Sequence, residues 1–167
     1  MQNKKILITG ASQGLGAVAA QAFAERGARL VLIARSEDKL SQVRLSCRNP
    51  ERHLCIAVDL LEMNNIEDAI NKARAFLGNI DVVLHAAGGG LGLKDDFLKY
   101  QDFLKLFILN LGAAAEINRL VASEMKETRS GYLVHIGSIA STEGVGSVGY
   151  NSVKRRWQPM FVVWVGS

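Results

Sequence analysis

The chain is short of the features that mark several classes of protein. Its 167 residues include only two cysteines, Cys47 and Cys55, which lack metal-site spacing and follow no export signal. We therefore expect free thiols, a cytoplasmic location and no bound metal. The apolar stretch near the end, 160–165, is far too short to cross a bilayer, and the N-terminus does not have the form of a signal peptide. No association with a membrane is expected.

Basic residues are not concentrated anywhere in the chain. The net charge is +4, but the 20 lysine and arginine residues are dispersed, and their densest cluster is Lys154-Arg155-Arg156. So short a cluster does not indicate nucleic-acid binding. Hydrophobic residues make up 49% of the chain, which at this length favours one soluble globular domain with its own core.

The segment 4–16, KKILITGASQGLG, combines a short apolar run with a glycine-rich turn. The run at 6–8 is typical of a strand buried on both faces, and the alanine-rich stretch 17–26 predicts a helix. Three glycines lie between them: Gly10, Gly14 and Gly16. Glycines at a strand-to-helix turn let a diphosphate approach the backbone at the helix N-terminus.

Apolar strands and amphipathic helices alternate along the rest of the chain. Strands are predicted over 6–8, 28–34, 53–58, 80–85 and 131–136. Helices are predicted over 17–26, from an N-cap at Ser36 to about Leu45, over 62–77, and over 95–122 in two pieces that meet near 110–112. The alternation predicts an α/β fold: a doubly wound, Rossmann-like parallel sheet in three layers, with helices on both faces.

Polar or glycine-rich segments follow the predicted strands. They are 10–16, Arg35, Asp59, 87–90 and Ser138. In a parallel sheet these segments meet at one edge, where ligands bind.

Arg35 follows the second strand, where a dinucleotide fold meets the adenosine ribose. An acid there would bind the 2′-hydroxyl group, whereas an arginine suits a 2′-phosphate, so NADP is favoured over NAD. The alternative is a solvated surface arginine. Asp59, after the third strand, is expected to accept a hydrogen bond from the adenine amino group; it is also a candidate helix N-cap.

Three residues late in the chain suggest proton-transfer chemistry. Tyr150 and Lys154 are four residues apart and share one face of a helix, which is also a common arrangement on a helix surface. An ammonium group beside a phenol lowers the phenol pKa, so that a tyrosine can act as a general acid or base. Ser138, at a strand end, is placed to hydrogen-bond the same substrate oxygen.

With these motifs in this order, the chain resembles the short-chain dehydrogenases/reductases over 5–154. Segment 9–16, TGASQGLG, fits the family's T-G-x-x-x-G-x-G motif, and Asp59-Leu60 fits its adenine-contacting acid. Asn110 fits the helix asparagine that holds a water in the family's proton relay. The catalytic trio is matched by Ser138, Tyr150 and Lys154.

The resemblance implies hydride transfer between a nicotinamide and a small carbonyl or alcohol substrate, most like the 3-oxoacyl-carrier-protein reductases. Tyr150 would protonate the carbonyl oxygen, Ser138 would orient it, and Lys154 would lower the Tyr150 pKa and hold the nicotinamide ribose. The full-length form is expected to be a homo-oligomer. The expected cofactor-binding residues are Gly10, Ser12, Gln13, Gly14, Leu15, Gly16, Arg35, Asp59, Leu60, Ala87, Gly88, Tyr150 and Lys154.

The chain departs from the family after the fourth strand. The family's Asn-Asn-Ala-Gly is His85-Ala86-Ala87-Gly88 here, so the close backbone approach is kept and the asparagine contacts are not. We interpret His85 as a buried strand-end residue rather than a catalytic base, and His135 as structural.

A second departure is the tail. Family members continue after Lys154 along an alanine-rich helix and add further strands, whereas here Pro159 would break that helix and both tryptophans of the chain lie within the last eleven residues. Moving the reading frame back one base permits AAVAAYVRRMG after Lys154, a helix of the family's kind. We interpret 1–154 as an incomplete dinucleotide-binding domain and 155–167 as an out-of-frame tail. The alternative is a genuinely divergent short end.

Three consequences are expected. The missing C-terminal strands should leave the strand over 131–136 as an uncovered edge. The chain should be an inactive or impaired portion of an NADP-dependent oxidoreductase. The alternatives are a non-catalytic nucleotide-binding or sensor domain on the same fold, which the retained Ser138, Tyr150 and Lys154 argue against, and a non-functional translation product.

Overall fold

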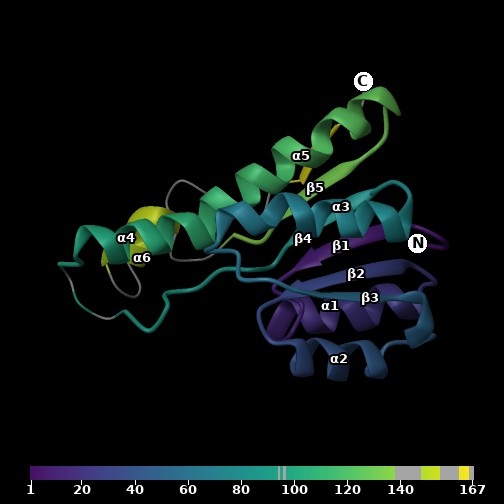
Figure 1. Ribbon diagram of the computed structural model, residues 1–167, viewed down its shortest axis with the longest axis horizontal. Coiled ribbons are helices and arrows are strands. Elements are labelled where there is room, and N and C mark those ends of the chain that lie inside the picture. Colours follow the sequence, from purple (N-terminus) through teal and green to yellow (C-terminus); the bar gives the residue numbers. More distant parts are fainter. Residues whose placement is uncertain (94, 96, 138–147, 155–161, 166–167) are drawn as a thin grey trace.

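The structure is a six-stranded sheet between two layers of helices (Figure 1). This computed structural model describes residues 1–93, 95, 97–137, 148–154 and 162–165. The strands are β1 (Lys5–Thr9), β2 (Arg29–Ala34), β3 (Leu54–Ala57), β4 (Val82–His85), β5 (Tyr132–His135) and β6 (Val162–Trp164). Their order is β3-β2-β1-β4-β5-β6, and the first five are parallel, as the alternation predicted.

The central strand β1 is buried on both faces, which explains its unbroken apolar sequence. Leu7 points into one core layer, with β2 and β4 residues and the helices α3 (Ile66–Leu77) and α5 (Ala113–Glu127). Ile6 and Ile8 point into the other layer, with α1 (Gly14–Glu25) and α2 (Glu37–Ser46). The side-chain alternation of a strand therefore gives each helical layer its own hydrophobic core.

The helix boundaries follow local signals. Ser36 is the N-cap of α2, as predicted, and its Oγ accepts a hydrogen bond from the Lys39 N–H at 3.4 Å. Gly27 follows α1 and Gly78 ends α3, both with positive φ (79° and 85°). Helix α1 begins at Gly14 rather than at residue 17, because the glycine turn itself forms the first helical turn. Two short 3-10 turns, Pro50–Arg52 and Met63–Asn65, precede β3 and α3 respectively.

One long helix runs from Tyr100 to Glu127 and contains a π-helical turn. The segments are α4 (Tyr100–Phe107), the π turn η3 (Ile108–Gly112) and α5, so the predicted junction of two pieces falls where the helix widens. By length and composition alone this helix is long and apolar enough to cross a membrane. Its α5 part instead contributes Ile117, Val121 and Met125 to the core beneath the sheet.

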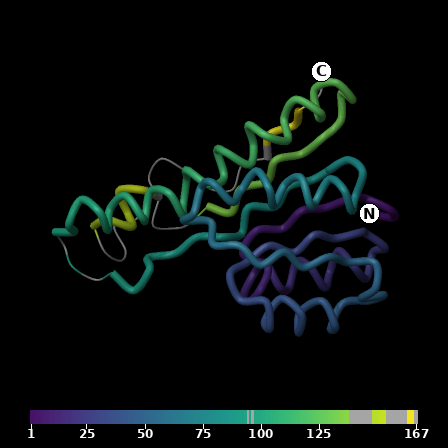
Figure 2. The backbone as a smooth tube through the Cα atoms, in the orientation of Figure 1, coloured from purple at the N-terminus to yellow at the C-terminus, as the bar shows by residue number. Residues whose placement is uncertain are grey.

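The edge of the sheet differs from expectation. β6 pairs with β5 in antiparallel fashion, Leu133 opposite Val163, so the prediction that the strand over 131–136 is an uncovered edge was wrong. Part of the tail supplies this strand, and the Trp164 side chain, 56% exposed, lies opposite Tyr132. The short helix α6 (Val148–Lys154) packs against α4 and η3 beyond the body of the sheet (Figures 1 and 2).

Candidate active site

A cleft of about 370 Å³ opens at the carboxyl ends of β1 to β4. Nearly all of the predicted nucleotide-binding residues line it, although they come from four separate turns. These are Gly10, Ser12, Gln13, Gly14, Leu15, Arg35, Asp59, Leu60, Ala87 and Gly88. The structure thus brings these ten residues together; the contact that each makes with a nucleotide remains a prediction.

The three motif glycines meet three different requirements. A Cβ atom on Gly10 would lie 2.6 Å from the Ala87 backbone N, and one on Gly16 would lie 2.3 Å from the Gly10 carbonyl oxygen. Both glycines therefore allow backbone to approach backbone. Gly14 has φ +56° and no atom within 4 Å of its Cβ position, so it faces open space in the cleft. The glycine turn is compact underneath and open where a ligand would approach.

The N-terminus of α1 faces this open space. Its N-cap residue, Gln13, has extended backbone and its side chain makes no capping hydrogen bond. Gln13, Gly14 and Leu15 all line the cleft. The first N–H groups of a helix and its positive dipole end bind anions, and this arrangement suits a diphosphate.

Two cationic residues line the cleft beyond the end of β2. Arg35, which the sequence singled out, is exposed, and Lys39 lines the same wall from the first turn of α2. No hydrogen bond or ion pair engages either side chain within the described part of the chain. Sequence analysis missed Lys39, although a lysine four residues after Arg35, past an N-cap serine, was a usable signal. Together the two can neutralise a doubly charged phosphate.

Asp59 lines the adjoining wall of the cleft. Its Oδ1 accepts a hydrogen bond from the Leu61 N–H at 3.0 Å, and the next helical turn has Glu62 as its N-cap. The alternative interpretation of Asp59 as a helix N-cap was therefore wrong. The bond holds the Asp59 carboxylate where it lines the cleft.

The segment after β4 is held by side chains from two other elements. Thr9 Oγ1 accepts a hydrogen bond from the Ala87 N–H at 3.3 Å. Asn110 in the π turn binds Gly89 twice: its Oδ1 accepts from the Gly89 N–H at 2.9 Å, and its Nδ2 donates to the Gly89 carbonyl at 3.0 Å. The second Nδ2 hydrogen goes to the Leu106 carbonyl at 3.0 Å. The Asn110 side chain therefore positions the loop, and the water that its family counterpart holds remains a prediction.

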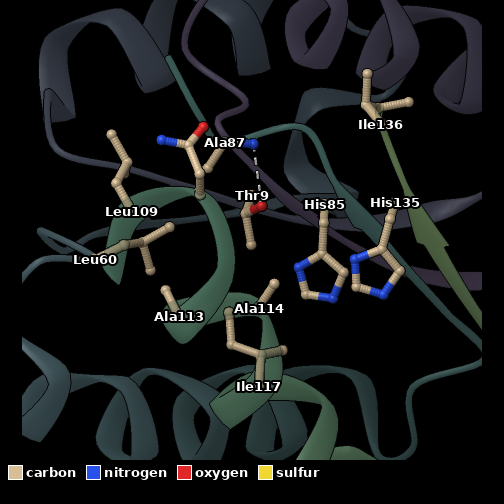
Figure 3. A pocket seen from close by; sticks show the side chains of 11 residues that line it. Thr9, Leu60, His85, Ala87, Leu109, Ala113, Ala114, Ile117, His135 and Ile136 are labelled. Carbon is tan, nitrogen blue, oxygen red and sulfur yellow. Dashed lines mark hydrogen bonds between the residues drawn. The ribbon is translucent and has the colours of Figure 1, made fainter. Parts of the chain in front are cut away.

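Beneath this segment lies a second, smaller cavity of about 20 Å³. Figure 3 shows Thr9 and the paired rings of His85 and His135 at its wall, facing Ala114 and Ile117 of α5. The two rings stack with their centroids 4.4 Å apart and 17° between their planes. Burial, and after it the neighbouring His135, lower the pKa of His85 to about 3, and burial lowers the pKa of His135 to about 4. Rings with so low a pKa are weak bases at pH 7, which favours a structural role for both.

The proton-transfer residues are placed only in part. Helix α6 carries Tyr150 and Lys154 one turn apart, and it packs on the π turn that contains Asn110. Ser138 lies outside the described residues, as does the helix end at Pro159. Among the residues that the structure describes, no group of three histidine, cysteine or acidic side chains is arranged to hold a metal ion.

Comparison with known proteins places this geometry in a family. Residues 4–158 match the sequence profile of the family described as "short chain dehydrogenase". The chain is 33% identical over 159 residues to 3-ketodihydrosphingosine reductase of Mus musculus, covering 89% of this chain and 47% of that protein. It is 30% identical over 167 residues to ketoacyl reductase HetN of Nostoc sp., covering 98% and 56% respectively. The chain thus spans about half the length of these curated relatives.

Solved structures show the same fold. A 7α-hydroxysteroid dehydrogenase complexed with NADH and 7-oxo glycochenodeoxycholic acid superposes with a TM-score of 0.85 at 27% identity, over 92% of this chain and 61% of that one. A short-chain dehydrogenase/reductase from Caenorhabditis elegans, solved with cofactor, gives a TM-score of 0.84 at 25% identity, over 93% and 60%. The profile match, the relatives and the shared fold agree, and the chain belongs to the short chain dehydrogenase family.

Proposed function

We propose that this chain is the cofactor-binding portion of an NADP-dependent oxidoreductase that interconverts a ketone and a secondary alcohol. The observation that carries the proposal is the pair of cations, Arg35 and Lys39, which line the cleft at its adenosine end and have no ion-pair partner among the described residues. Glu37 and Asp38, in the first turn of α2, do not line the cleft, and the acid that does line it, Asp59, follows β3 rather than β2. Directly after β2 a 2′-phosphate would therefore meet two positive charges, and a 2′-hydroxyl would find no acid in that segment of the wall.

The strand order supports one orientation of the cofactor. The adenosine half would lie over β2 and β3, between Arg35 and Asp59, and the diphosphate at the N-terminus of α1. The nicotinamide half would then extend across β1 toward β4, where Ala87 and Gly88 line the cleft. Of the three motif glycines only Gly14 has open space at its Cβ position, and we expect the diphosphate to approach the backbone there.

The chemistry that we propose follows the family pattern. The bound nicotinamide supplies or accepts the hydride. Tyr150 donates a proton to the carbonyl oxygen in the reducing direction, Ser138 hydrogen-bonds the same oxygen, and Lys154 holds the nicotinamide ribose from the next turn of α6. Asn110 fixes the backbone at Gly89 through two hydrogen bonds.

The relatives suggest a class of substrate. Both named curated relatives are reductases of ketones, one of 3-ketodihydrosphingosine and one described as a ketoacyl reductase. We therefore propose reduction of a ketone, and not alcohol oxidation, as the direction of the complete protein.

Equilibrium titration of the purified chain with NADPH and with NADH tests the proposal. NADPH should bind more tightly, and Arg35→Ala should reduce that preference by about tenfold or more, since a charge-assisted hydrogen bond contributes roughly 1.5–3 kcal/mol. Lys39→Ala should reduce it as well. Lys126→Ala, which removes an exposed lysine at the far end of α5, is the matched control and should leave the preference unchanged. Equal affinities for the two nucleotides in the unmutated chain would refute the NADP assignment.

A further inference from the structure

Two buried histidines and an asparagine connect the sheet to the long helix, and the proposed chemistry assigns them no role. His85 ends β4 and His135 ends β5, directly opposite each other in the parallel register. They are 5% and 4% exposed. Asn118, on α5, hydrogen-bonds both: its Oδ1 lies 2.8 Å from His85 Nε2 and its Nδ2 lies 3.2 Å from His135 Nε2. We call these three residues the His–Asn–His bridge.

The amide orientation fixes where the ring protons sit. An amide oxygen only accepts, so His85 Nε2 carries its proton and donates to Asn118 Oδ1. An amide nitrogen only donates, so His135 Nε2 is unprotonated and accepts from Asn118 Nδ2. The two neutral rings thus have opposite tautomers, and they stack face to face. This arrangement holds each ring in one orientation.

The position of the bridge relates it to the cofactor cleft. The segment 86–88 lines the cleft on the side where the nicotinamide half would lie. The residues on either side of the segment are held by hydrogen bonds. His85, just before it, bonds to Asn118, and Gly89, just after it, bonds to Asn110. Both anchors belong to the same long helix. The helix thus fixes both ends of the segment, and Thr9 fixes its middle.

We propose that the His–Asn–His bridge positions the segment 86–88 for the nicotinamide half of the cofactor. The inference rests on the proposed function, because it presumes a dinucleotide in the cleft. His85 and Asn118 are then positioning residues that act through the backbone of 86–88, and His135 holds the His85 ring in place. His85 stands where the family motif has an asparagine, so the bridge belongs to this chain's departure from that motif.

Two ligands that fill different lengths of the cleft distinguish a positioning role from a general effect on stability. NADPH spans the whole cleft, whereas adenosine 2′,5′-bisphosphate fills only the adenosine half. Asn118→Leu should weaken NADPH binding by about tenfold, the effect of about one hydrogen bond, and leave binding of the bisphosphate within about twofold. Val121→Ala, one turn further along α5 and fully buried, is the matched control. It should lower thermal stability without separating the two ligands.

A second variant and a spectroscopic measurement keep the proposal testable even if Asn118→Leu does not fold. The chain has three histidines, so ring ¹⁵N spectra are simple. We expect one Nε2–H and one Nδ1–H neutral tautomer for His85 and His135. In Asn118→Asp the carboxylate should accept from Nε2–H of both rings, so His135 should change to the Nε2–H tautomer and NADPH affinity should return to within about threefold.

The outcomes are distinct. If the unmutated chain binds neither ligand, the proposed function fails and this inference fails with it. If both ligands bind and Asn118→Leu weakens both equally or neither, the proposed function stands and the positioning role is refuted. Two identical ring tautomers in the unmutated chain would contradict the bridge itself.

Discussion

Mild acid should destabilise this fold strongly, because its buried histidines are held neutral. Burial lowers the pKa of His85 to about 3 and that of His135 to about 4, against 6.5 in the unfolded chain. Between these values the unfolded state binds more protons than the folded state, so the free energy of unfolding falls as pH falls. The stabilisation is complete above pH 6.5 and is lost progressively toward pH 3 to 4. Its direction is set by desolvation, and by the like charge that a protonated neighbour would present across the stack.

The size of the effect follows from linkage. For each ring that stays neutral in the folded state and titrates at 6.5 in the unfolded state, the free energy of unfolding falls by roughly 2 kcal/mol between pH 7 and pH 5. The two rings together should therefore lower the free energy of unfolding by roughly 4 kcal/mol, a large part of the roughly 5–15 kcal/mol that a typical domain has. The estimate needs only that both rings remain neutral at pH 5. His53 adds to it, because burial lowers its pKa too and its Nδ1 accepts from the Leu30 N–H at 3.3 Å.

Urea unfolding followed by circular dichroism at pH 7, 6 and 5 measures this directly. The double variant His85→Asn/His135→Asn should keep only the contribution of His53, and so lose less of its free energy of unfolding over the same range than the unmutated chain does. Carboxyl groups contribute little in this window because they titrate near pH 4. An unfolding midpoint that does not change between pH 7 and pH 5 in the unmutated chain would refute the reasoning.

Three further predictions concern the turn, the chemistry and the tail. Gly10→Ala should lower the unfolding midpoint sharply, since its Cβ would lie 2.6 Å from the Ala87 backbone N; a thermal melt indistinguishable from that of the unmutated chain would contradict this. In a version extended to the length of its relatives, Tyr150→Phe should abolish ketone reduction while NADPH still binds, as steady-state rates and fluorescence titration can show. Removing residues 155–167 should expose the edge of β5 and increase aggregation, measured by light scattering; equal solubility would mean that β6 does not protect that edge.

Much of the fold could be predicted because the strands have a clear sequence pattern. β1 and β2 are unbroken apolar runs buried on both faces, and glycines mark the turns around them. The alternation with helices then determines a parallel sheet and the edge at which ligands bind. Even the junction in the long helix was located correctly at 110–112, although its π-helical form was not anticipated.

What could not be predicted depends on contacts between distant elements. The three-residue strand β6 has no strong pattern of its own, and its pairing with β5 is decided by tertiary contacts. Asn118 looks like an ordinary helix residue until the fold brings it to His85 and His135, 33 and 17 residues away. The family resemblance singled out Asn110 as the residue that holds a water, which stays a prediction, whereas its hydrogen bonds to Gly89 are visible only in three dimensions.

The central claim is that the cleft at the carboxyl ends of β1 to β4 binds NADP. Amide chemical-shift mapping of the isotopically labelled chain during titration with NADP⁺ tests it most directly. The account predicts saturable shifts concentrated at the turn 10–16, at Arg35 and Lys39, and at the segment 86–89, with little change along β6. Shifts that do not saturate, or that centre away from the glycine turn, would contradict it.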